Sequence, residues 1–97
     1  MTRFRDDISA LYGDRLERIV LFGSRARGDE RPDSDYDVAV FLRDFTNRWV
    51  EVDRIVPLET DILYDTGGVI NALPFQAGAY NEPTPLMHEL RLEGRDI

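Results

Sequence analysis

Two aspartates and a glycine–serine pair are the residues of this chain whose types and spacing are best suited to chemistry. Gly23 and Ser24 follow one apolar run, and Asp35 and Asp37 open the next. Alternate residues of a strand share a face, so the two carboxylates should lie side by side. Paired carboxylates repel each other unless a cation lies between them, and Mg²⁺ takes oxygen ligands from one or two carboxylates together with substrate phosphates. We therefore expect a metal site at the aspartates, and a phosphate beside the backbone N–H groups of the Gly-Ser turn.

Three apolar runs bounded by glycine, proline or aspartate predict the strands that position these residues. They cover residues 19–22, 36–42 and 69–75, and residues 69–73 form the part of the third run that belongs to the core of the sheet. In the second run, the opposite face carries Tyr36, Val38, Val40 and Leu42. The expected fold class is α/β (α+β), a small mixed β-sheet backed by helices.

Helical periodicity predicts a first helix that ends at Gly13, a long helix over residues 45–66 and a closing helix over residues 86–92. In the long helix, Pro57 should produce a kink or split the helix in two. Four apolar residues keep the helical period of this segment, and two more lie beside them. The four are Trp49, Val52, Val56 and Leu63, and the two are Ile55 and Ile62. Residues 24–28 are long enough for one helical turn, whose amino end attracts phosphate through its free N–H groups and its dipole.

Two arginines, Arg25 and Arg27, flank that helical turn. They suit contact with a triphosphate. Arg27 also belongs to an ordinary exposed mixture of charges with Asp29, Glu30 and Arg31, in which an arginine contributes little. The sequence therefore leaves both interpretations of the arginines open.

Length and composition indicate a single folded domain over residues 1–97. A hydrophobic content of 42% and a charged content of 32% suit a soluble globular protein. The chain has no cysteine, so it can form neither disulfides nor thiolate metal sites. Its first residues lack the apolar core of a signal peptide, and no apolar run approaches the length of a membrane span. We therefore expect a cytoplasmic protein without a membrane partner.

The formal net charge of −7 restricts the binding partners. It argues against direct nucleic-acid binding, because Lys and Arg side chains that neutralise phosphates provide most of that affinity. A nucleotide substrate remains compatible with this charge, since metal ions held on carboxylates can neutralise its phosphates. A basic protein partner and an oligomer are also compatible with it.

The spacing of Gly23-Ser24, ten residues, Asp35, one residue and Asp37 reproduces the G-S-x10-D-x-D signature of the DNA polymerase β-like nucleotidyltransferase superfamily. In length, the chain resembles the minimal nucleotidyltransferase (MNT) branch of that superfamily. The resemblance extends over residues 23–42. It implies the polymerase β-like fold, with Asp35 and Asp37 binding two Mg²⁺ ions that bridge the triphosphate of ATP. It also implies that Gly23 and Ser24 hold the β- and γ-phosphates, which leaves the α-phosphate open to in-line attack.

The resemblance is incomplete at the third acidic position. Active members of the family usually carry another carboxylate on the strand that follows the long helix, and our placement puts Asn71 there. An amide oxygen can bind a metal, but asparagine is neither charged nor a base. The nearest acids, Asp61 and Asp65, are expected on the solvated face of the long helix. With Asn71 at this tentative third-ligand position, catalysis should be weakened or lost.

Two classes of function follow from the resemblance. The first is an enzyme that transfers AMP from ATP to a hydroxyl group, which for minimal nucleotidyltransferases is often a tyrosine of a HEPN-domain ribonuclease. The small protein would then be the antitoxin of that toxin. The second is an inhibitory subunit that binds a nucleotide or the partner without turnover. A third carboxylate in the pocket would favour the enzyme.

Overall fold

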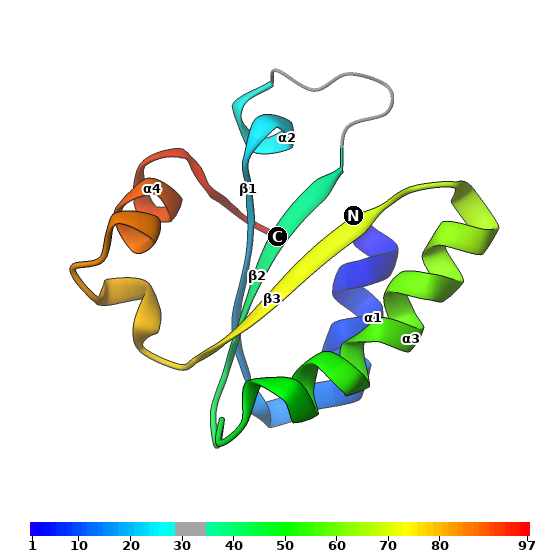
Figure 1. Cartoon of the computed structure of the whole chain (residues 1–97), viewed down its shortest axis with the longest axis horizontal. Coiled ribbons are helices and arrows are strands. Elements are labelled where there is room, and N and C mark those ends of the chain that lie inside the picture. Colours follow the sequence, from blue (N-terminus) through cyan, green and yellow to red (C-terminus); the bar gives the residue numbers. More distant parts are fainter. Residues whose placement is uncertain (29–34) are drawn as a thin grey trace.

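A four-stranded mixed sheet forms the centre of the computed structural model, which describes residues 1–28 and 35–97 (Figure 1). The strands lie in the order β3-β2-β1-β4. β1 runs antiparallel to β2 and β4, whereas β3 runs parallel to β2. Their bounds are β1 (Leu16–Phe22), β2 (Tyr36–Leu42), β3 (Ile70–Gln76) and β4 (Arg95–Asp96). The expected mixed sheet is confirmed.

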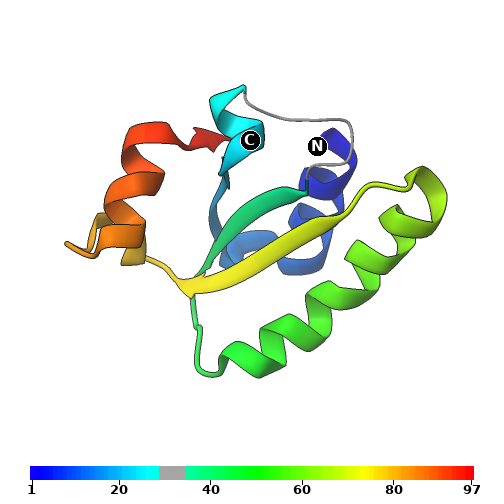
Figure 2. The ribbon, with the colours of Figure 1, turned by 45° about the horizontal axis from the view of Figure 1, so that its top comes forward.

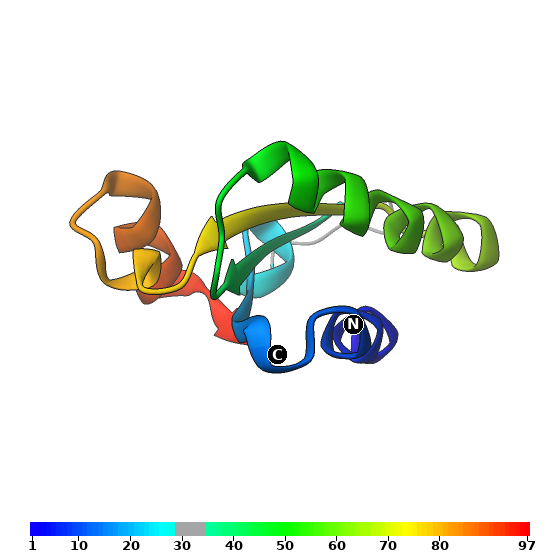
Figure 3. The same cartoon turned by 90° about the horizontal axis from the view of Figure 1, so that it is seen from below.

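Helices cover both faces of this sheet (Figures 1 and 3). The helices of the described residues are α1 (Thr2–Tyr12), α2 (Ser24–Arg27), α3 (Arg48–Thr66) and α4 (Pro85–Glu93), with 3₁₀ turns over Gly13–Arg15 and Ala79–Asn81. α1 and α3 pack on one face and α4 packs on the other. α3 runs along β3, the strand at one edge of the sheet (Figure 2). No helix of residues 1–28 and 35–97 is long and apolar enough to cross a membrane.

β2 is buried on both faces, which explains why its sequence is one continuous apolar run. Val38, Val40 and Leu42 pack against α1 and α3, whereas Ala39 and Phe41 pack beneath α4. The larger cluster is completed by Phe4, Ile8, Tyr12, Ile19, Ile55, Ile62 and Ile70, and the smaller one by Val20, Met87 and Leu90. The two cores fix the central strand, and with it the position of the aspartates at its start.

Glu51 is a charged side chain within this core, with 3% of its surface exposed. The Tyr12 hydroxyl donates a hydrogen bond to its Oε1 over 3.2 Å, and Arg15 and Arg54 pair with its two oxygens. Burial, followed by the charge of Glu51, raises the pKa of the Tyr12 hydroxyl. These contacts tie α1 and the turn after it to the first half of α3.

The structure corrects several predicted boundaries. β1 begins at Leu16, three residues earlier than expected, and β3 is shifted to Ile70–Gln76. α3 begins at Arg48, because the side chain of Asn47 caps it by accepting a hydrogen bond from the N–H of Trp49 over 2.9 Å. The predicted split at Pro57 is wrong, since α3 continues through it as one helix. Pro57 and Asp53 are both exposed, so water can satisfy the carbonyl that proline leaves without a donor.

The apolar residues that predicted α3 do not all face the core. Ile55 and Ile62 are buried, whereas Trp49, Val56 and Leu63 are 70%, 44% and 44% exposed. Two apolar stripes therefore lie next to each other on the same helix, and only one of them packs against the sheet. The spacing of the apolar residues therefore predicted the helix, but not which of its two apolar stripes is buried.

Candidate active site

The Gly-Ser turn and the aspartates meet because β1 and β2 are antiparallel. Phe22, the last residue of β1, pairs with Asp37 near the beginning of β2. Gly23 follows with a positive φ of 74°, and the chain then enters α2 at Ser24. The turn is therefore placed directly beside the aspartates, as the sequence predicted.

Gly23 and Asp37 lie so close that no side chain fits between them. A Cβ atom added at Gly23 would lie 2.6 Å from Oδ2 of Asp37, well inside van der Waals contact. The positive φ of Gly23 independently favours glycine. Asp37 is thus held against the backbone of the turn, where a carboxylate and N–H groups can share one ligand.

Asn71 reaches the same place from β3. β2 and β3 are parallel, and Asn71 pairs with Asp37 in their register. The amide Nδ2 of Asn71 donates a hydrogen bond to Oδ2 of Asp35 over 3.0 Å. The expected position of Asn71 beside the two aspartates is therefore seen in the structure, while its role as a ligand stays a prediction.

The aspartates open onto the face of the sheet that carries α4. Ala39 and Phe41, which alternate with Asp37 along β2, pack in the cluster beneath α4. Tyr36 points to the opposite face and packs against the α1–α3 core. Asp35 is exposed and Asp37 is partly buried, so the site is accessible to a solvated ligand such as a nucleotide.

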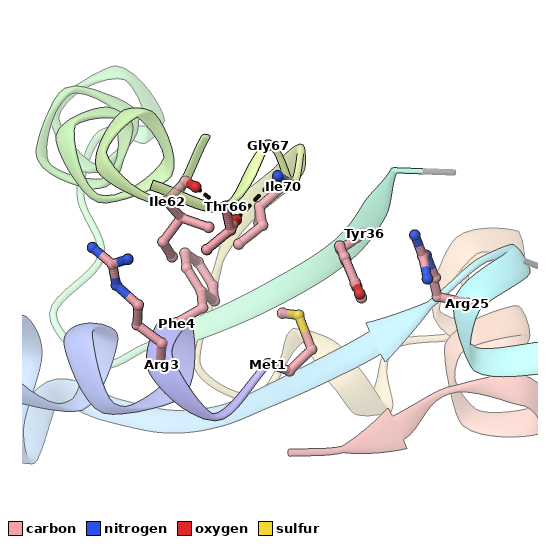
Figure 4. Close-up of a pocket in the computed structure, with 10 residues that line it drawn as sticks. Met1, Arg3, Phe4, Arg25, Tyr36, Ile62, Thr66, Gly67 and Ile70 are labelled. Carbon is pink, nitrogen blue, oxygen red and sulfur yellow. Dashed lines mark hydrogen bonds between the residues drawn. The ribbon is translucent and has the colours of Figure 1, made fainter. Parts of the chain in front are cut away.

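Arg25 lies on the other face from the aspartates. Its guanidinium group is 4.2 Å from the centroid of the Tyr36 ring, where the ring face attracts a cation. Figure 4 shows the two side chains next to each other at one end of a pocket of about 340 Å³ between α1, α3 and β2. The triphosphate contact predicted for Arg25 stays a prediction. The side chains of Ser24 and Arg27 lie outside the described residues, and so do Asp29, Glu30 and Arg31.

The two acids of α3 that were the nearest alternatives to a third carboxylate do not reach the site. Asp61 and Asp65 are both exposed, and Asp65 pairs with Arg3 of α1 over 2.9 Å. They belong to the solvated surface of α3, as expected for acids on that face of the helix.

Glu59 is an acid near the site that the sequence analysis did not single out. It lines a hollow of about 170 Å³ at the edge of β3 together with Thr60, Leu63, Val69, Ile70 and Asn71. Burial raises the pKa of its carboxyl group, and a hydrogen bond from the backbone of Ala72 opposes this rise. Its position in the sequence could have identified Glu59 as partly buried. It lies four residues after Ile55 and three before Ile62, and residues at this spacing share one face of a helix.

The donor atoms at this site fit magnesium. Two carboxylates and the carbonyl oxygen of an amide are hard oxygen ligands, and the chain has no cysteine to supply a thiolate. Among the described residues there is no group of three or more His, Cys, Asp or Glu that could hold a metal. Mg²⁺ commonly combines one or two carboxylates with substrate phosphates and waters, and Asp35 and Asp37 suit that kind of site.

Comparison with known proteins agrees with this geometry. Residues 1–81 match the family model described as the nucleotidyltransferase domain. This chain belongs to the nucleotidyltransferase domain family. Two proteins of Methanocaldococcus jannaschii, both named as proposed protein adenylyltransferases, are similar to it. MJ0604 is 34% identical over 79 residues, which cover 81% of this chain and 73% of that protein. MJ0141 is 46% identical over 41 residues, which cover 42% of this chain and 41% of that protein.

Solved structures share the fold of this nucleotidyltransferase domain. A toxin–antitoxin structure with AMP-PNP contains a chain that superimposes with a TM-score of 0.61 at 23% identity. The superposition covers 94% of this chain and 69% of the other. The structure of a proposed nucleotidyltransferase from Sulfolobus solfataricus gives a TM-score of 0.57 at 17% identity, over 96% of this chain and 71% of the other. At these identities the likeness establishes the fold alone.

Proposed function

We propose that this nucleotidyltransferase domain transfers AMP from ATP to a hydroxyl group of a protein toxin, and so acts as the antitoxin. The observation that carries the proposal is the contact of Asp37 with the Gly23 turn, with Asp35 beside it. It combines carboxylates for a metal with backbone N–H groups for phosphate, which a nucleoside triphosphate requires together.

Each residue of the site has a defined part in this reaction. Asp35 and Asp37 would hold Mg²⁺, two ions in the active state, which would neutralise the triphosphate and the charge that develops on it. Gly23 and Ser24 hold the β- and γ-phosphates, and Arg25 and Arg27 are the cations nearest to them in sequence. The acceptor oxygen bonds to the α-phosphorus, the bond to the β-phosphate oxygen breaks, and pyrophosphate leaves. The hydroxyl proton passes to water, because Asn71 cannot accept it.

The protein partner is inferred from the relatives and from the charge of the chain. Both named relatives are proposed protein adenylyltransferases, and a structural neighbour comes from a toxin–antitoxin structure with AMP-PNP. The net charge of −7 suits a basic protein partner. We propose a tyrosine of a HEPN-domain ribonuclease as the acceptor, on the basis of the resemblance to minimal nucleotidyltransferases.

A second function is favoured by one contact. The Asn71 amide lies beside Asp35. If this is the third-ligand position of the family, the described residues of the pocket offer two charged ligands there, Asp35 and Asp37. The domain would then bind the nucleotide or the toxin and inhibit it without turnover. Loss of a general base alone lowers rates by about 10²–10⁴-fold.

Transfer of radiolabelled AMP to the co-purified toxin separates the two functions. We expect slow transfer by the wild type, faster transfer by Asn71→Asp and none by Asp37→Asn. No transfer by the wild type or by Asn71→Asp, with the toxin still inhibited, would establish the inhibitory subunit. Robust wild-type transfer that Asn71→Asp does not improve would mean that Asn71 is not the third position.

A further inference from the structure

The two halves of the candidate active site, the Gly-Ser turn and the aspartates, are joined by a contact behind them. Arg25 directly follows Ser24 in the chain. Tyr36 lies between Asp35 and Asp37. The guanidinium carbon of Arg25 is 4.2 Å from the centroid of the Tyr36 ring, where the ring face attracts a cation. The contact therefore links the residue after the turn to the residue between the aspartates.

Tyr36 is held in place by the sheet and by the core. Its backbone N–H donates a hydrogen bond to the carbonyl of Val69 over 2.8 Å, and it pairs with Ile70 in the parallel register of β2 and β3. Its side chain packs against the α1–α3 core, and Figure 4 shows it at the end of the pocket that Arg25 borders. Tyr36 therefore has a fixed position relative to the aspartates on either side of it.

α2, which carries Arg25, is too short to keep its orientation by itself. It covers Ser24–Arg27, and a single helical turn is unstable in isolation. Ala26 is 4% exposed, and its N–H donates a hydrogen bond to the carbonyl of Gly23 over 3.2 Å. These contacts bury the middle of α2 and close the turn, whereas the contact with Tyr36 connects α2 to the strand of the aspartates.

We propose that Arg25 and Tyr36 are positioning residues, which hold the Gly-Ser turn against the aspartates from the opposite face of the sheet. The side chain of Tyr36 packs on the α1–α3 side, and Arg25 lies over its ring there. Both residues would then act on the nucleotide through the turn and not by touching it. The inference rests on the proposed nucleotide site, and it gives Arg25 a role distinct from direct contact with the triphosphate.

The strength of the contact sets the size of its effect. Arg25 and Tyr36 are both partly exposed, and a cation over an aromatic ring at such a site changes an equilibrium by about two- to fivefold. A positioning contact can raise the affinity for ATP by no more than this factor, since it contributes only its own free energy. Direct binding of Arg25 to a phosphate would not depend on the Tyr36 ring. The two roles therefore predict different responses to loss of the ring.

A double-mutant cycle in ATP affinity separates the two roles. Calorimetry of the full chain with Mg²⁺ and ATP would compare the wild type with Arg25→Ala, Tyr36→Leu and the double variant. We expect Tyr36→Leu to lower the affinity about two- to fivefold, and the loss caused by Arg25→Ala to be smaller by about the same factor when the ring is absent. Any other interaction of Arg25 is lost in both backgrounds and cancels in the cycle.

A conservative variant and a distant pair provide the controls. Tyr36→Phe keeps the ring and should bind ATP as the wild type does. Arg18 lies over the Tyr80 ring at 4.0 Å, and Tyr80 packs against the cluster beneath α4. Tyr80→Leu removes this second contact and should leave the magnesium-dependent ATP affinity unchanged. Circular dichroism checks that each variant is folded.

Amide hydrogen exchange gives a readout that needs no nucleotide. The hydrogen bond from the Ala26 N–H to Gly23 breaks when α2 opens, and the amide then exchanges with water. This exchange, followed by NMR, should be about two- to fivefold faster in Tyr36→Leu than in the wild type or Tyr36→Phe. The Gly94 N–H, which bonds to Leu90 at the end of α4 over 2.9 Å, is the reference amide and should not change.

Two results would overturn the proposal. One is a cycle in which the two losses add without coupling, because Arg25 would then act independently of the ring. The other is an unchanged rate of Ala26 exchange in Tyr36→Leu. A wild type that binds no ATP with Mg²⁺, while Ala26 exchange responds to Tyr36→Leu as expected, would instead refute the proposed function and support the position assigned to the turn.

Discussion

The amide of Asn71 donates a hydrogen bond to the carboxylate of Asp35 across the β2–β3 boundary, over 3.0 Å. In this arrangement the amide satisfies one oxygen that a cation would otherwise bind. A half-turn of the amide presents its oxygen instead, so the same residue can serve a site with or without metal. A carboxylate at residue 71 would present only oxygens to Asp35 and could not form this hydrogen bond.

Asn71→Asp should make folding depend on magnesium. Without metal, a carboxylate at residue 71 repels Asp35 and loses the hydrogen bond, so we expect a loss of about 1 kcal/mol in the free energy of unfolding. With Mg²⁺, the variant should recover more stability than the wild type, because a third carboxylate binds the cation more tightly. Thermal unfolding with and without Mg²⁺ measures both effects. An equal response of the two proteins to Mg²⁺ would contradict the placement of Asn71.

Gly23→Ala should damage the site through a clash as well as through the backbone. The positive φ of 74° costs a side chain about 1–2 kcal/mol, and the new Cβ would also displace the Asp37 carboxylate. Gly28→Ala is the matched control, since Gly28 has a φ of 82° but no atom of residues 1–28 and 35–97 lies within 4 Å of its Cβ position. We expect both variants to lose stability, and Gly23→Ala alone to lose metal-dependent ATP affinity. Calorimetry that found equal ATP affinity in the two variants would refute the contact.

Arg15→Met should destabilise the protein by leaving the buried Glu51 carboxylate with less compensation. We expect a loss of about 1–3 kcal/mol, because Tyr12 and Arg54 still contact Glu51. Arg54→Met, at a half-exposed pair, should cost less. Urea unfolding of the two variants measures which loses more stability. An equal or larger loss in Arg54→Met would show that the pair of Arg15 with Glu51 is not the stronger one.

Glu59→Gln should make stability less dependent on pH. Burial raises the pKa of Glu59 in the folded state above its unfolded value. Its favourable contribution is therefore present below the unfolded pKa and is lost as the pH rises through the folded pKa. The variant should unfold at a higher temperature than the wild type at neutral pH, and at the same temperature below about pH 4.

The matched control for Glu59→Gln is Asp61→Asn, at an exposed position of the same helix. It should change the unfolding temperature little at either pH, since surface substitutions mostly alter stability by less than about 0.5 kcal/mol. A Glu59→Gln variant that unfolds below the wild type at neutral pH would mean that the hydrogen bond from Ala72 outweighs burial.

The sequence predicted the residues of the site better than the faces of the helices. Gly23, Asp35 and Asp37 were singled out because their spacing brackets two apolar runs, and Asn71 because the family resemblance places a third ligand on the strand after the long helix. That strand runs parallel to β2, which brings Asn71 beside the aspartates. The exposed and the buried apolar stripes of α3 could not be told apart, since Trp49 and Ile55 both keep the helical period and only tertiary packing selects between them. Glu59 was missed because its surroundings come from Ala72, on a different element.

Calorimetric titration of ATP is the most direct test of the proposed nucleotide site at Gly23, Asp35 and Asp37. The account predicts that wild-type protein binds ATP much more tightly with Mg²⁺ than without it, because neither the aspartates nor the turn forms a closed site alone. In the double variant Asp35→Ala plus Asp37→Ala, the magnesium-dependent part of the affinity should be lost while the fold remains. Unchanged ATP affinity of the folded double variant in the presence of Mg²⁺ would contradict the account.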